Sequence, residues 1–409
     1  MPTGRGVAVF LAGLALWVAA RLVGSPGMEV VAIGVAVLPF VAGGVVRWSH
    51  PRFVVHRRLS DVRVDPGTRV TIELEVENRT SSPTSFLLVE DQLPASLGRP
   101  ARVVVTGIAP HKSQTVRYTV LPQKRGRFRI GPLSLDATDP FALTRKRLQF
   151  ADRDELVVTP TVEDLRIPTE AGTGRGFGSS RAMHLFRSGQ EYYTMREYQT
   201  GDDLRRIHWP SVARTGDLMI RQDESSRRAS GMVFLDTRSG ALGKDGSPGF
   251  EKAVSVAASI GVLLIREGFS LKVATPSIAP HPVAEDTFLD ELSAISDAQA
   301  RSLGPALANL RAGASADASL VVVCAPPEGA ELVGVIRAGQ GFGPRLAVLV
   351  YPHEPSSLPP KRQAEQEGRA THARLTLIRA GWDVIVLPPS MPLRDRWHTP
   401  SEHRLARTV

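Results

Sequence analysis

Charged side chains are dense between Gln190 and Glu224. The segment holds seven acids and five bases, and all five bases are arginine. A guanidinium group pairs with a carboxylate through two parallel hydrogen bonds, which the ammonium of lysine cannot do. The residue types therefore predict an ion-pair network used for structure or for docking. The acids are Glu191, Glu197, Asp202, Asp203, Asp217, Asp223 and Glu224, and the bases are Arg196, Arg205, Arg206, Arg214 and Arg221.

His208 is the residue of this segment best suited to acid–base catalysis, because imidazole titrates near neutral pH. A carboxylate beside it would complete a general-base pair. Beside it, however, the sequence has no Gly-x-Ser-x-Gly turn, no Walker A sequence and no His-Glu-x-x-His pair. We therefore expect that the chain is not an enzyme and that this network stabilises the structure or docks a partner.

A turn at Gly201 and an N-cap at Asp202 predict a short helix in the middle of the segment. Ile207 and Trp209 would face a core from that helix. Pro210 would stop or kink it, because proline lacks the N–H that the helix interior needs.

The glycine-rich run at residues 172–178, Gly-Thr-Gly-Arg-Gly-Phe-Gly, superficially resembles a phosphate-binding loop. A dinucleotide-binding loop follows a strand and opens a helix. This run follows Ile167-Pro168-Thr169 and precedes polar and basic residues. We therefore expect a linker here.

The first 50 residues predict a membrane-spanning helical hairpin. Val7 to Ala20 and Val30 to Val46 are uncharged apolar runs, and Gly24 to Gly27 is a turn sequence between them. We expect spans over about residues 7–23 and 30–46.

The flanking arginines predict the orientation of this hairpin. Arg5 precedes the first run and four arginines follow the second within residues 47–58, so both cationic flanks fall on one side, expected to be the cytoplasm. Arg21, near the outer end, would have to extend to the headgroups. Two alternatives stay open, namely a cleaved signal peptide containing the first run and a buried hairpin in a soluble fold.

Residues 60–150 predict a β-sandwich domain. Apolar and polar residues alternate from Val70 to Glu77, as in a strand with one buried face, and further short strand candidates follow between turns. The segment has no His or carboxylate cluster with ligand spacing, which favours an adaptor or spacer.

Much of the net charge of +9 gathers in the second half of that domain. A basic face near the bilayer would attract an anionic membrane surface. The competing interpretation is a solvated edge that discourages strand aggregation. Nucleic-acid binding is not expected, because the aromatic residues needed for base stacking are missing. The cations are Lys124, Arg125, Arg127, Arg129, Arg145, Lys146 and Arg147.

Residues 231–390 predict an α/β domain with a mostly parallel sheet. Apolar strand candidates such as residues 319–324 alternate with helix candidates, as in a sheet covered by helices on both faces. Cys324 is the single cysteine, which excludes an internal disulfide and a cysteine-based zinc site, and it is expected in the core. Residues 151–230 are then a linker with the arginine-rich segment, and residues 391–409 a polar tail.

The arginine-rich segment carries a spaced pattern: Arg196-Glu197-Tyr198, then Gly201-Asp202-Asp203-x-Arg205-x-Ile207-x-Trp209, then Arg214. This pattern closely resembles the signature of the bacterial DUF58 family, a domain of unknown function. The resemblance extends upstream through Arg125-Gly126-Arg127, Gly131-Pro132 and Asp139-Pro140-Phe141. It also includes the paired N-terminal spans.

The resemblance implies a fold and a partner. Family members are typically membrane-anchored, join a β-rich domain to a von Willebrand factor A-like domain, and are encoded near MoxR-type AAA+ ATPases. We therefore expect an α+β multidomain chain. It would consist of a transmembrane helical hairpin, a β-sandwich and a C-terminal von Willebrand factor A-like (Rossmann-like) α/β domain.

The von Willebrand-like metal site is an Asp-x-Ser-x-Ser sequence after the first strand of the sheet, where oxygen atoms bind a hard cation such as magnesium. Here the sequence is Asp236-Thr237-Arg238-Ser239-Gly240. Asp236, Thr237 and Ser239 could supply oxygen ligands. Arg238 would repel a cation and could pair with Asp236 instead, so a protein-docking rim without a cofactor is the leading expectation.

These patterns lead to one main hypothesis and one alternative. The main one is a membrane-anchored, non-enzymatic scaffold whose signature residues dock a partner, with a MoxR-type ATPase implied by the family resemblance. The alternative is a metal-dependent adhesion or hydrolytic module that uses Asp236.

Overall fold

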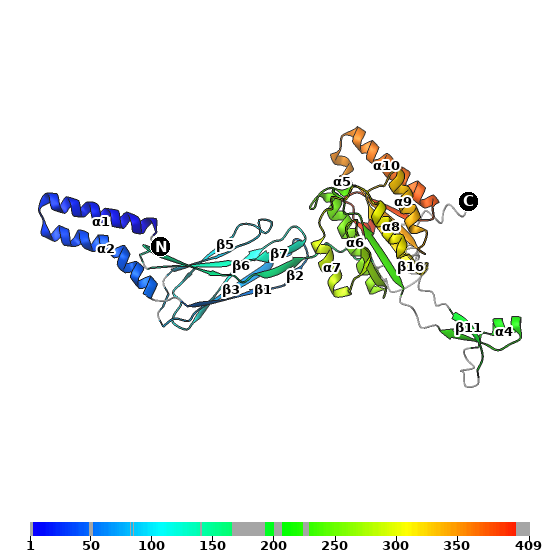
Figure 1. Cartoon of the computed structure of the whole chain (residues 1–409), viewed down its shortest axis with the longest axis horizontal. Helices are drawn as coiled ribbons and strands as arrows, with labels where there is room; N and C mark the ends of the chain where they lie inside the picture. Colours follow the sequence, from blue (N-terminus) through cyan, green and yellow to red (C-terminus); the bar gives the residue numbers. More distant parts are fainter. Residues whose placement is uncertain are drawn as a thin grey trace. The chain divides into compact units, whose positions relative to one another are not determined.

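The chain folds as an α+β protein with two apolar N-terminal helices and several sheets, which confirms the expected class at this level (Figure 1). It divides into two compact units, Met1–Thr159 and Pro160–Val409. The computed structural model describes residues 3–48, 52–81, 83–84, 86–139, 141–165, 193–199, 207–223 and 229–397.

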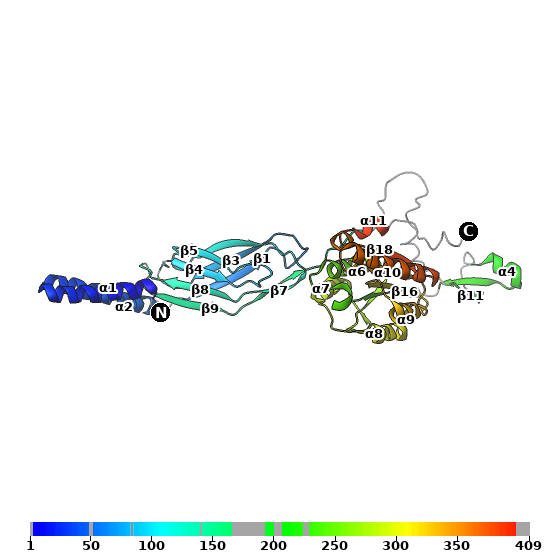
Figure 2. The same ribbon diagram turned by 90° about the horizontal axis from the view of Figure 1, so that it is seen from above.

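Two helices, α1 (Gly4–Val23) and α2 (Pro26–Trp48), form the expected N-terminal hairpin. They lie side by side in Figure 1 and one over the other in Figure 2. Windows within them reach mean hydropathies of 2.1 and 1.8, so both are long and apolar enough to cross a membrane. Gly24 ends α1 with a φ of 72°, a left-handed conformation that glycine adopts without a steric penalty.

Small residues bring α1 and α2 together. A Cβ added at Gly13 would lie 2.6 Å from the backbone nitrogen of Ala36, so the close approach depends on this glycine. One turn earlier in α1, the rings of Phe10 and Phe40 meet edge to face with centroids 5.5 Å apart.

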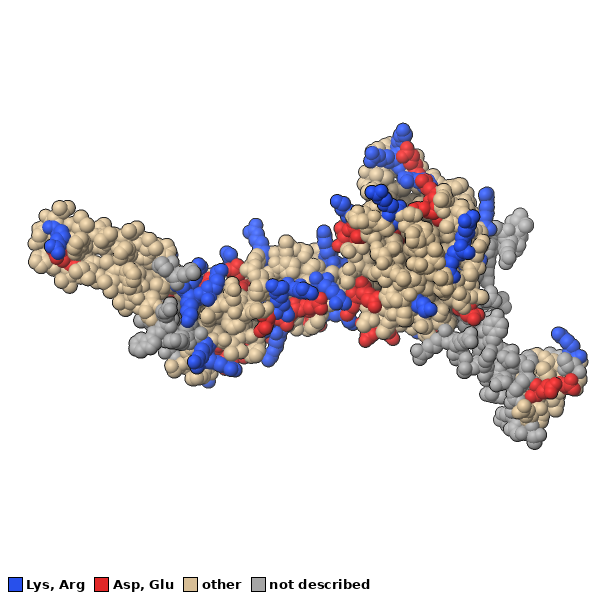
Figure 3. Space-filling model, in the orientation of Figure 1, with Lys and Arg blue, Asp and Glu red and all other residues tan. Residues whose placement is uncertain are grey.

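Arg21 has partners at the end of the hairpin where the chain turns. Its Nε lies 3.4 Å from Oε1 of Glu29, and its guanidinium lies 5.3 Å from the ring centroid of Trp17. In Figure 3 the visible face of the hairpin has charged atoms only near this end. Arg21 thus has an ion-pair partner where the chain turns, and its extension to the headgroups stays a prediction.

Three sheets make up the rest of the first unit, with strand orders β1-β3-β6, β2-β10-β7 and β5-β4-β8-β9. Their buried faces share one apolar core. The strands are β1 (Phe53–Leu59), β2 (Arg63–Val64), β3 (Val70–Asn78), β4 (Phe86–Asp91), β5 (Ala101–Thr106), β6 (Ser113–Val120), β7 (Gly126–Ile130), β8 (Leu133–Thr138), β9 (Arg145–Phe150) and β10 (Asp154–Val158).

Strand β3 shows why the alternating pattern is a dependable signal. Val70, Ile72, Leu74 and Val76 are buried and the residues between them are partly exposed, as predicted.

The strands of this unit begin before residue 60 and end after residue 150, beyond the expected limits. Strand β1 carries three consecutive basic residues, so its sequence lacks a clear apolar face. Tertiary pairing compensates for this. Arg57, whose side chain is 5% exposed, donates through Nη2 to Asp91 at 2.6 Å and through Nη1 to Asp154 at 2.7 Å.

Five of the seven clustered cations lie on two edge strands of different sheets, namely Arg127 and Arg129 on β7 and residues 145–147 on β9. Asp136 accepts hydrogen bonds at 2.8 Å from Nε and Nη2 of Arg147 and lies 3.4 Å from Arg145. Burial of Asp136 opposes these interactions, but the hydrogen bonds from Arg147 dominate and lower the pKa of its carboxyl. Cationic edges of this kind discourage edge-to-edge pairing of sheets.

The second unit contains a six-stranded sheet with the order β15-β14-β13-β16-β17-β18. All neighbouring pairs are parallel except β14 and β15, which are antiparallel. The mostly parallel sheet expected from the sequence is therefore present. Its strands are β13 (Ser230–Leu235), β14 (Ser270–Ala274), β15 (His281–Pro282), β16 (Ala318–Cys324), β17 (Arg345–Val350) and β18 (Asp383–Leu387).

Two apolar cores cover the two faces of this sheet, because alternate residues of a strand point to opposite faces. Val233 and Leu235 join one core with helices α6, α7 and α11, whereas Met232 and Phe234 join the other with α8, α9 and α10. The helices are α5 (Ser239–Leu242), α6 (Pro248–Arg266), α7 (Glu285–Ala294), α8 (Gly304–Ala312), α9 (Gly329–Gly339), α10 (Pro360–Arg379) and α11 (Leu393–Trp397).

Helix α6 is also long and apolar enough to cross a membrane, but 67% of its apolar window is buried inside the protein. Its residues from Phe250 to Leu264 supply much of one core. We therefore assign α6 to the folded core of the second unit.

The second unit is larger at both ends than the sequence suggested. The segment expected to begin a linker packs on α6, since Ser255 donates to the carbonyl of Thr161 at 2.6 Å and Lys252 pairs with Glu163 at 2.8 Å. The expected polar tail begins with α11, whose Leu393 and Trp397 are buried. Both segments have only a few apolar residues among polar ones. Such residues give a weak periodic signal, so the sequence did not predict that these segments belong to the folded unit.

Candidate functional site

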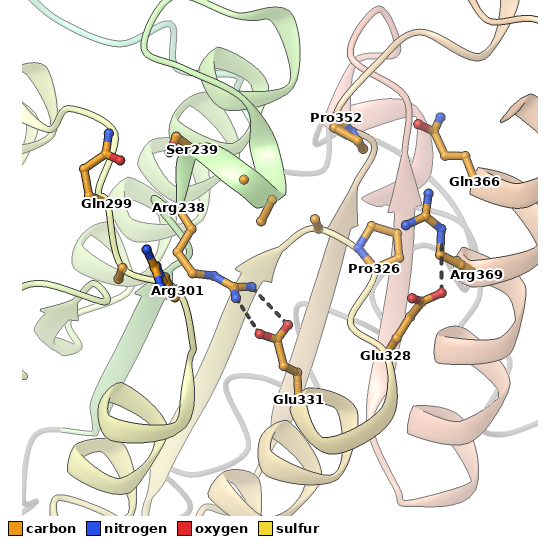
Figure 4. A pocket seen from close by; sticks show the side chains of 14 residues that line it. Arg238, Ser239, Gln299, Arg301, Pro326, Glu328, Glu331, Pro352, Gln366 and Arg369 are labelled. Carbon is orange, nitrogen blue, oxygen red and sulfur yellow. Dashed lines mark hydrogen bonds and ion pairs between the residues drawn. The ribbon is translucent and has the colours of Figure 1, made fainter.

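A cavity of about 660 Å³ lies at the carboxyl ends of β13, β16 and β17 (Figure 4). Strands β13 and β16 are neighbours, yet the chain leaves them toward opposite edges of the sheet, to β14 and to β17. Such a reversal of strand order opens a crevice in which α/β proteins bind ligands. The lining residues are Arg238, Ser239, Gly240, Ala241, Gln299, Ala300, Arg301, Ala325, Pro326, Glu328, Glu331, Pro352, Gln366 and Arg369.

Arg238 forms the floor of this cavity and is held between two carboxylates. Its Nε and Nη2 donate to Oδ1 and Oδ2 of Asp236, both at 2.9 Å. Its Nη2 also donates to Oε2 of Glu331 on α9 at 3.1 Å, and its Nη1 donates to Oε1 of the same residue. Figure 4 shows the guanidinium reaching across the cavity to Glu331. The guanidinium fork thus joins the end of the first strand to α9.

The surroundings fix the charge of this group. Asp236 is fully buried, and the side chain of Arg238 is 10% exposed. Burial alone lowers the pKa of Arg238, but the hydrogen bonds to Asp236 and Glu331 outweigh it and raise the pKa above its ordinary value. Arg238 is therefore a permanent cation inside the protein.

The residues predicted as metal ligands do not fit a divalent cation in this arrangement. Both oxygens of Asp236 accept hydrogen bonds from Arg238, which places a positive guanidinium beside the only carboxylate of the set. The hydroxyl of Ser239 lies 3.5 Å from the carbonyl oxygen of Ala298. Thr237 is buried. Among the residues that the structure describes, no three His, Cys, Asp or Glu side chains converge as metal ligands would.

Two further arginines stand at the rim of the cavity. Arg301 is exposed and has no hydrogen bond or ion pair with any residue in the described part of the chain. Arg369 on α10 faces Glu328, with Nε 3.6 Å from Oε1, and both side chains are more than half exposed. The rim therefore presents one free guanidinium and one loose ion pair that a ligand could open.

Gln366 adds a buried polar group to the same wall. It is 4% exposed and donates from Nε2 to the carbonyl of His353 at 3.1 Å. It lies one turn before Arg369 on α10, so both side chains line the cavity.

The predicted signature residues lie on a separate small element. Strands β11 (Tyr193–Glu197) and β12 (Met219–Asp223) pair antiparallel, with Arg196 opposite Ile220. Four of the signature residues, Gly201, Asp202, Asp203 and Arg205, lie outside the described residues.

The helix predicted after Asp202 falls mostly outside the described residues, and the structure has a helix after it. Helix α4 runs from Trp209 to Thr215, so Pro210 opens the helix instead of ending it. The first turn of a helix tolerates proline because its N–H groups have no partner inside the helix. Trp209 is 65% exposed and does not face a core, whereas Ile207 is buried and bridges Ile220.

Three further signature side chains of this element are described, those of Glu197, Tyr198 and Arg214. Glu197 and Arg214 are exposed, and Tyr198 is half-buried while its N–H donates to the carbonyl of Leu218 at 2.8 Å. The ring of His208 hydrogen-bonds through Nδ1 to Oγ of Ser211 at 2.9 Å. In the described part of this element, the partner of His208 is a hydroxyl and not the carboxylate that a general-base pair needs.

Cys324 ends β16 and is a core residue, as expected. It is 1% exposed, and burial raises the pKa of its thiol. A thiol that is buried and neutral is a poor nucleophile.

Comparison with known proteins places this site in a family. Residues 194–314 match the family described as "Protein of unknown function DUF58", and they include Asp236, Arg238 and Arg301. A relative, "Uncharacterized protein YeaD" of Bacillus subtilis (strain 168), is 26% identical over 248 residues. These two matches support assignment of the chain to the DUF58 family. The match covers 59% of this DUF58 protein and 60% of the relative, so the chain spans well under two thirds of that relative's length.

Similarity to solved structures is low. The CARDB domain of the PF1109 protein from Pyrococcus furiosus is 12% identical with a TM-score of 0.20, and the match covers 27% of this chain and 94% of that one. A β-glucosidase from Listeria innocua is 15% identical with a TM-score of 0.17, covering 25% and 16%. Scores this low carry no argument about the fold or function of this DUF58 protein.

Sequence reasoning identified Asp236 and Arg238 but missed the rest of the cavity. Glu331, Arg301 and Arg369 are far apart in the chain, and none belongs to a recognisable motif. Glu331 and Arg369 lie on the helices that follow β16 and β17, which is the one signal that could have grouped them, since carboxyl ends of parallel strands meet at one edge. Arg301 lies in the loop between α7 and α8 and gives no such signal.

Proposed function

We propose that this DUF58 protein is a membrane-anchored, non-enzymatic docking protein. The N-terminal hairpin anchors it, the β-rich unit serves as a β-sandwich spacer, and the von Willebrand factor A-like α/β unit binds the partner. The flanking arginines support an orientation with both units in the cytoplasm.

One observation carries this proposal. At the carboxyl edge of the sheet, where a cation would have to sit, Arg238 already neutralises the buried Asp236. A fixed guanidinium pair offers no nucleophile, no titrating base and no metal-bound water. It does offer a rigid floor beneath an open cavity, and rigid floors suit binding.

The chemistry of the rim indicates the partner group. The free guanidinium of Arg301 and the loosely paired Arg369 favour a carboxylate, which accepts bidentate hydrogen bonds from arginine. We therefore propose that an acidic side chain of a partner protein enters the cavity. The family resemblance names a MoxR-type AAA+ ATPase as the partner to test first.

The signature element is proposed as a second contact. Trp209, Glu197 and Arg214 are exposed, and exposed tryptophan and arginine residues are frequent in the centres of protein interfaces. Trp209→Ala in the full chain should therefore weaken the same complex.

The test is recovery of the ATPase with the full-length protein, purified in mild detergent from the native cells. Arg301→Glu should abolish recovery, because the new carboxylate repels the incoming one. Arg311→Glu is the matched control, since Arg311 is equally exposed on α8 but does not line the cavity. Equal recovery with both variants would contradict docking at the cavity. Stabilisation of the wild-type chain by millimolar magnesium would favour the metal-dependent alternative.

A further inference from the structure

The turn between β8 and β9 is held by internal hydrogen bonds among Asp139 and residues 141–144. Oδ1 of Asp139 accepts from the N–H of Phe141 at 2.9 Å, and Oδ2 accepts from the N–H and the hydroxyl of Thr144. Asp139 is 3% exposed, so these hydrogen bonds are buried. Ala142 has a φ of 55°, a left-handed conformation that alanine adopts only when its surroundings impose it.

This turn is joined to the first residue of the N-terminal hairpin. Thr3, the N-cap of α1, donates from its N–H to the carbonyl of Leu143 at 2.9 Å. Its hydroxyl donates to the carbonyls of Ala142 at 2.7 Å and Leu143 at 3.0 Å. A Cβ at Gly6 would collide with the carbonyl oxygen of Leu143, so the turn and α1 are in direct contact.

An aromatic side chain is exposed at this junction. Phe141 is 66% exposed although its backbone is held by Asp139. An exposed phenylalanine ring in a rigid turn contributes no burial of apolar surface to the stability of the fold. Aromatic residues placed next to the ends of membrane-spanning helices partition into the headgroup region of the bilayer.

Cations surround the same junction. Arg5 on the first turn of α1 is exposed, and Arg145 directly follows the turn with a side chain 51% exposed. Arg147 is also exposed, although both β9 arginines share Asp136 as an ion-pair partner. Cations next to the end of a membrane-spanning helix attract anionic headgroups.

We propose that the turn between β8 and β9, described at Asp139 and residues 141–144, is a membrane-interface contact, in which Phe141 enters the headgroup region of a bilayer containing anionic phospholipid. Arg5 and Arg145 contact the lipid phosphates around it. The contact makes the β-rich unit lie directly on the bilayer surface at the base of the hairpin. This inference rests on the membrane anchorage in the proposed function and goes beyond it by assigning a lipid-binding surface to the β-rich unit.

The test measures the depth of nitroxide labels on the full chain in vesicles of phosphatidylglycerol and phosphatidylethanolamine. Labelling is site-specific because Cys324, the single cysteine, is buried. Three labelling positions are compared, each with one introduced cysteine: Phe141→Cys, Leu11→Cys and Leu121→Cys. Leu11 is exposed in the middle of α1 and should report the hydrocarbon core.

Leu121 is the matched control for exposure. It is 49% exposed and follows Val120, which pairs with Val70 at the end of β3 away from Phe53. That end is roughly 26 Å along β3 from the end next to α2, at about 3.3 Å per residue.

The expected result is that the Phe141 label is more accessible to oxygen than to a water-soluble nickel chelate, while the Leu121 label shows the reverse. A Leu11 label in lipid combined with a Phe141 label in water would overturn this inference alone. A Leu11 label in water would overturn the anchorage itself, and with it the proposed function. If the Phe141 label is at the same depth in vesicles of purely zwitterionic lipid, the contribution of Arg5 and Arg145 is refuted.

Discussion

At the level of single residues, Arg238 lies between two carboxylates that would otherwise need a bound cation to balance them. The positive charge is thereby covalently part of the chain, and it is present at every pH at which the protein is folded. A guanidinium has no vacant orbital to polarise a ligand, so the site retains the charge of a metal site without its Lewis acidity.

Replacing Arg238 should be strongly destabilising. In Arg238→Met, Asp236 is left buried without its partner, and breaking such a pair costs about 3–5 kcal/mol. We expect that loss in urea-induced unfolding of the full chain in mild detergent, followed by the emission of buried Trp382 and Trp397.

Two further variants test whether the loss comes from the unpaired charge of Asp236. Arg301→Met should change stability by no more than about 0.5 kcal/mol, because Arg301 is exposed. Asp236→Asn combined with Arg238→Met should recover part of the loss, because no net charge is then buried. If Arg301→Met lost as much stability as Arg238→Met, the loss would come from disturbance of the cavity wall and not from the buried ion pair.

His281 makes the stability of the second unit depend on pH. A hydrogen bond from Nε2 to Oε2 of Glu291 at 3.0 Å raises the pKa of His281 above 6.5. A group whose pKa is higher in the folded state contributes its full stabilisation at pH values below its pKa in the unfolded chain. That contribution is lost as the pH rises through its pKa in the folded state.

The wild-type chain should therefore lose stability relative to His281→Gln between about pH 6 and pH 8. The side chain is 36% exposed, and exposed ion pairs contribute on the order of 0.2–1 kcal/mol. Denaturation midpoints of the two proteins at several pH values provide the measurement. A difference that grows as the pH rises would contradict the assignment.

At the level of elements, the hairpin depends on close contact between its helices. Gly13→Ile should separate α1 from α2, because any Cβ at this position overlaps Ala36. Overpacking of this kind costs about 1–3 kcal/mol. In a Phe10→Cys/Phe40→Cys chain in bilayers, a short bis-maleimide should therefore cross-link fewer molecules after this substitution. Gly34→Ile is the control, since nothing lies within 4 Å of a Cβ there.

Element boundaries show which signals in the sequence are dependable. The alternation in β3 and the apolar runs of α1 and α2 were read correctly because burial on one face, or all around, leaves a local pattern. Strand β1 was missed because Arg57 is buried by ion pairs to Asp91 and Asp154, which come from other strands. Helix α8 buries Ala306, Leu307 and Leu310, so the apolar face that it adds to the core is short.

At the level of the whole molecule, the sidedness of the membrane determines which partners can reach the two folded units. The arginine flanks predict that both units are cytoplasmic. Protease added to intact spheroplasts should therefore leave them uncut, and the same protease should cut them after lysis. Cleavage in intact spheroplasts would place the units outside and exclude a cytoplasmic ATPase as partner.

The sequence by itself determined the two apolar helices, the alternating strand pattern, the α/β repeats and the DUF58 signature. Each of these depends on residue types within a few positions of one another. Only the tertiary structure decided that Arg238 pairs with Glu331 as well as Asp236, and that the Asp139 turn meets Thr3. These contacts join residues 93 and up to 140 positions apart, and no local pattern encodes which distant side chains the packing of strands brings together.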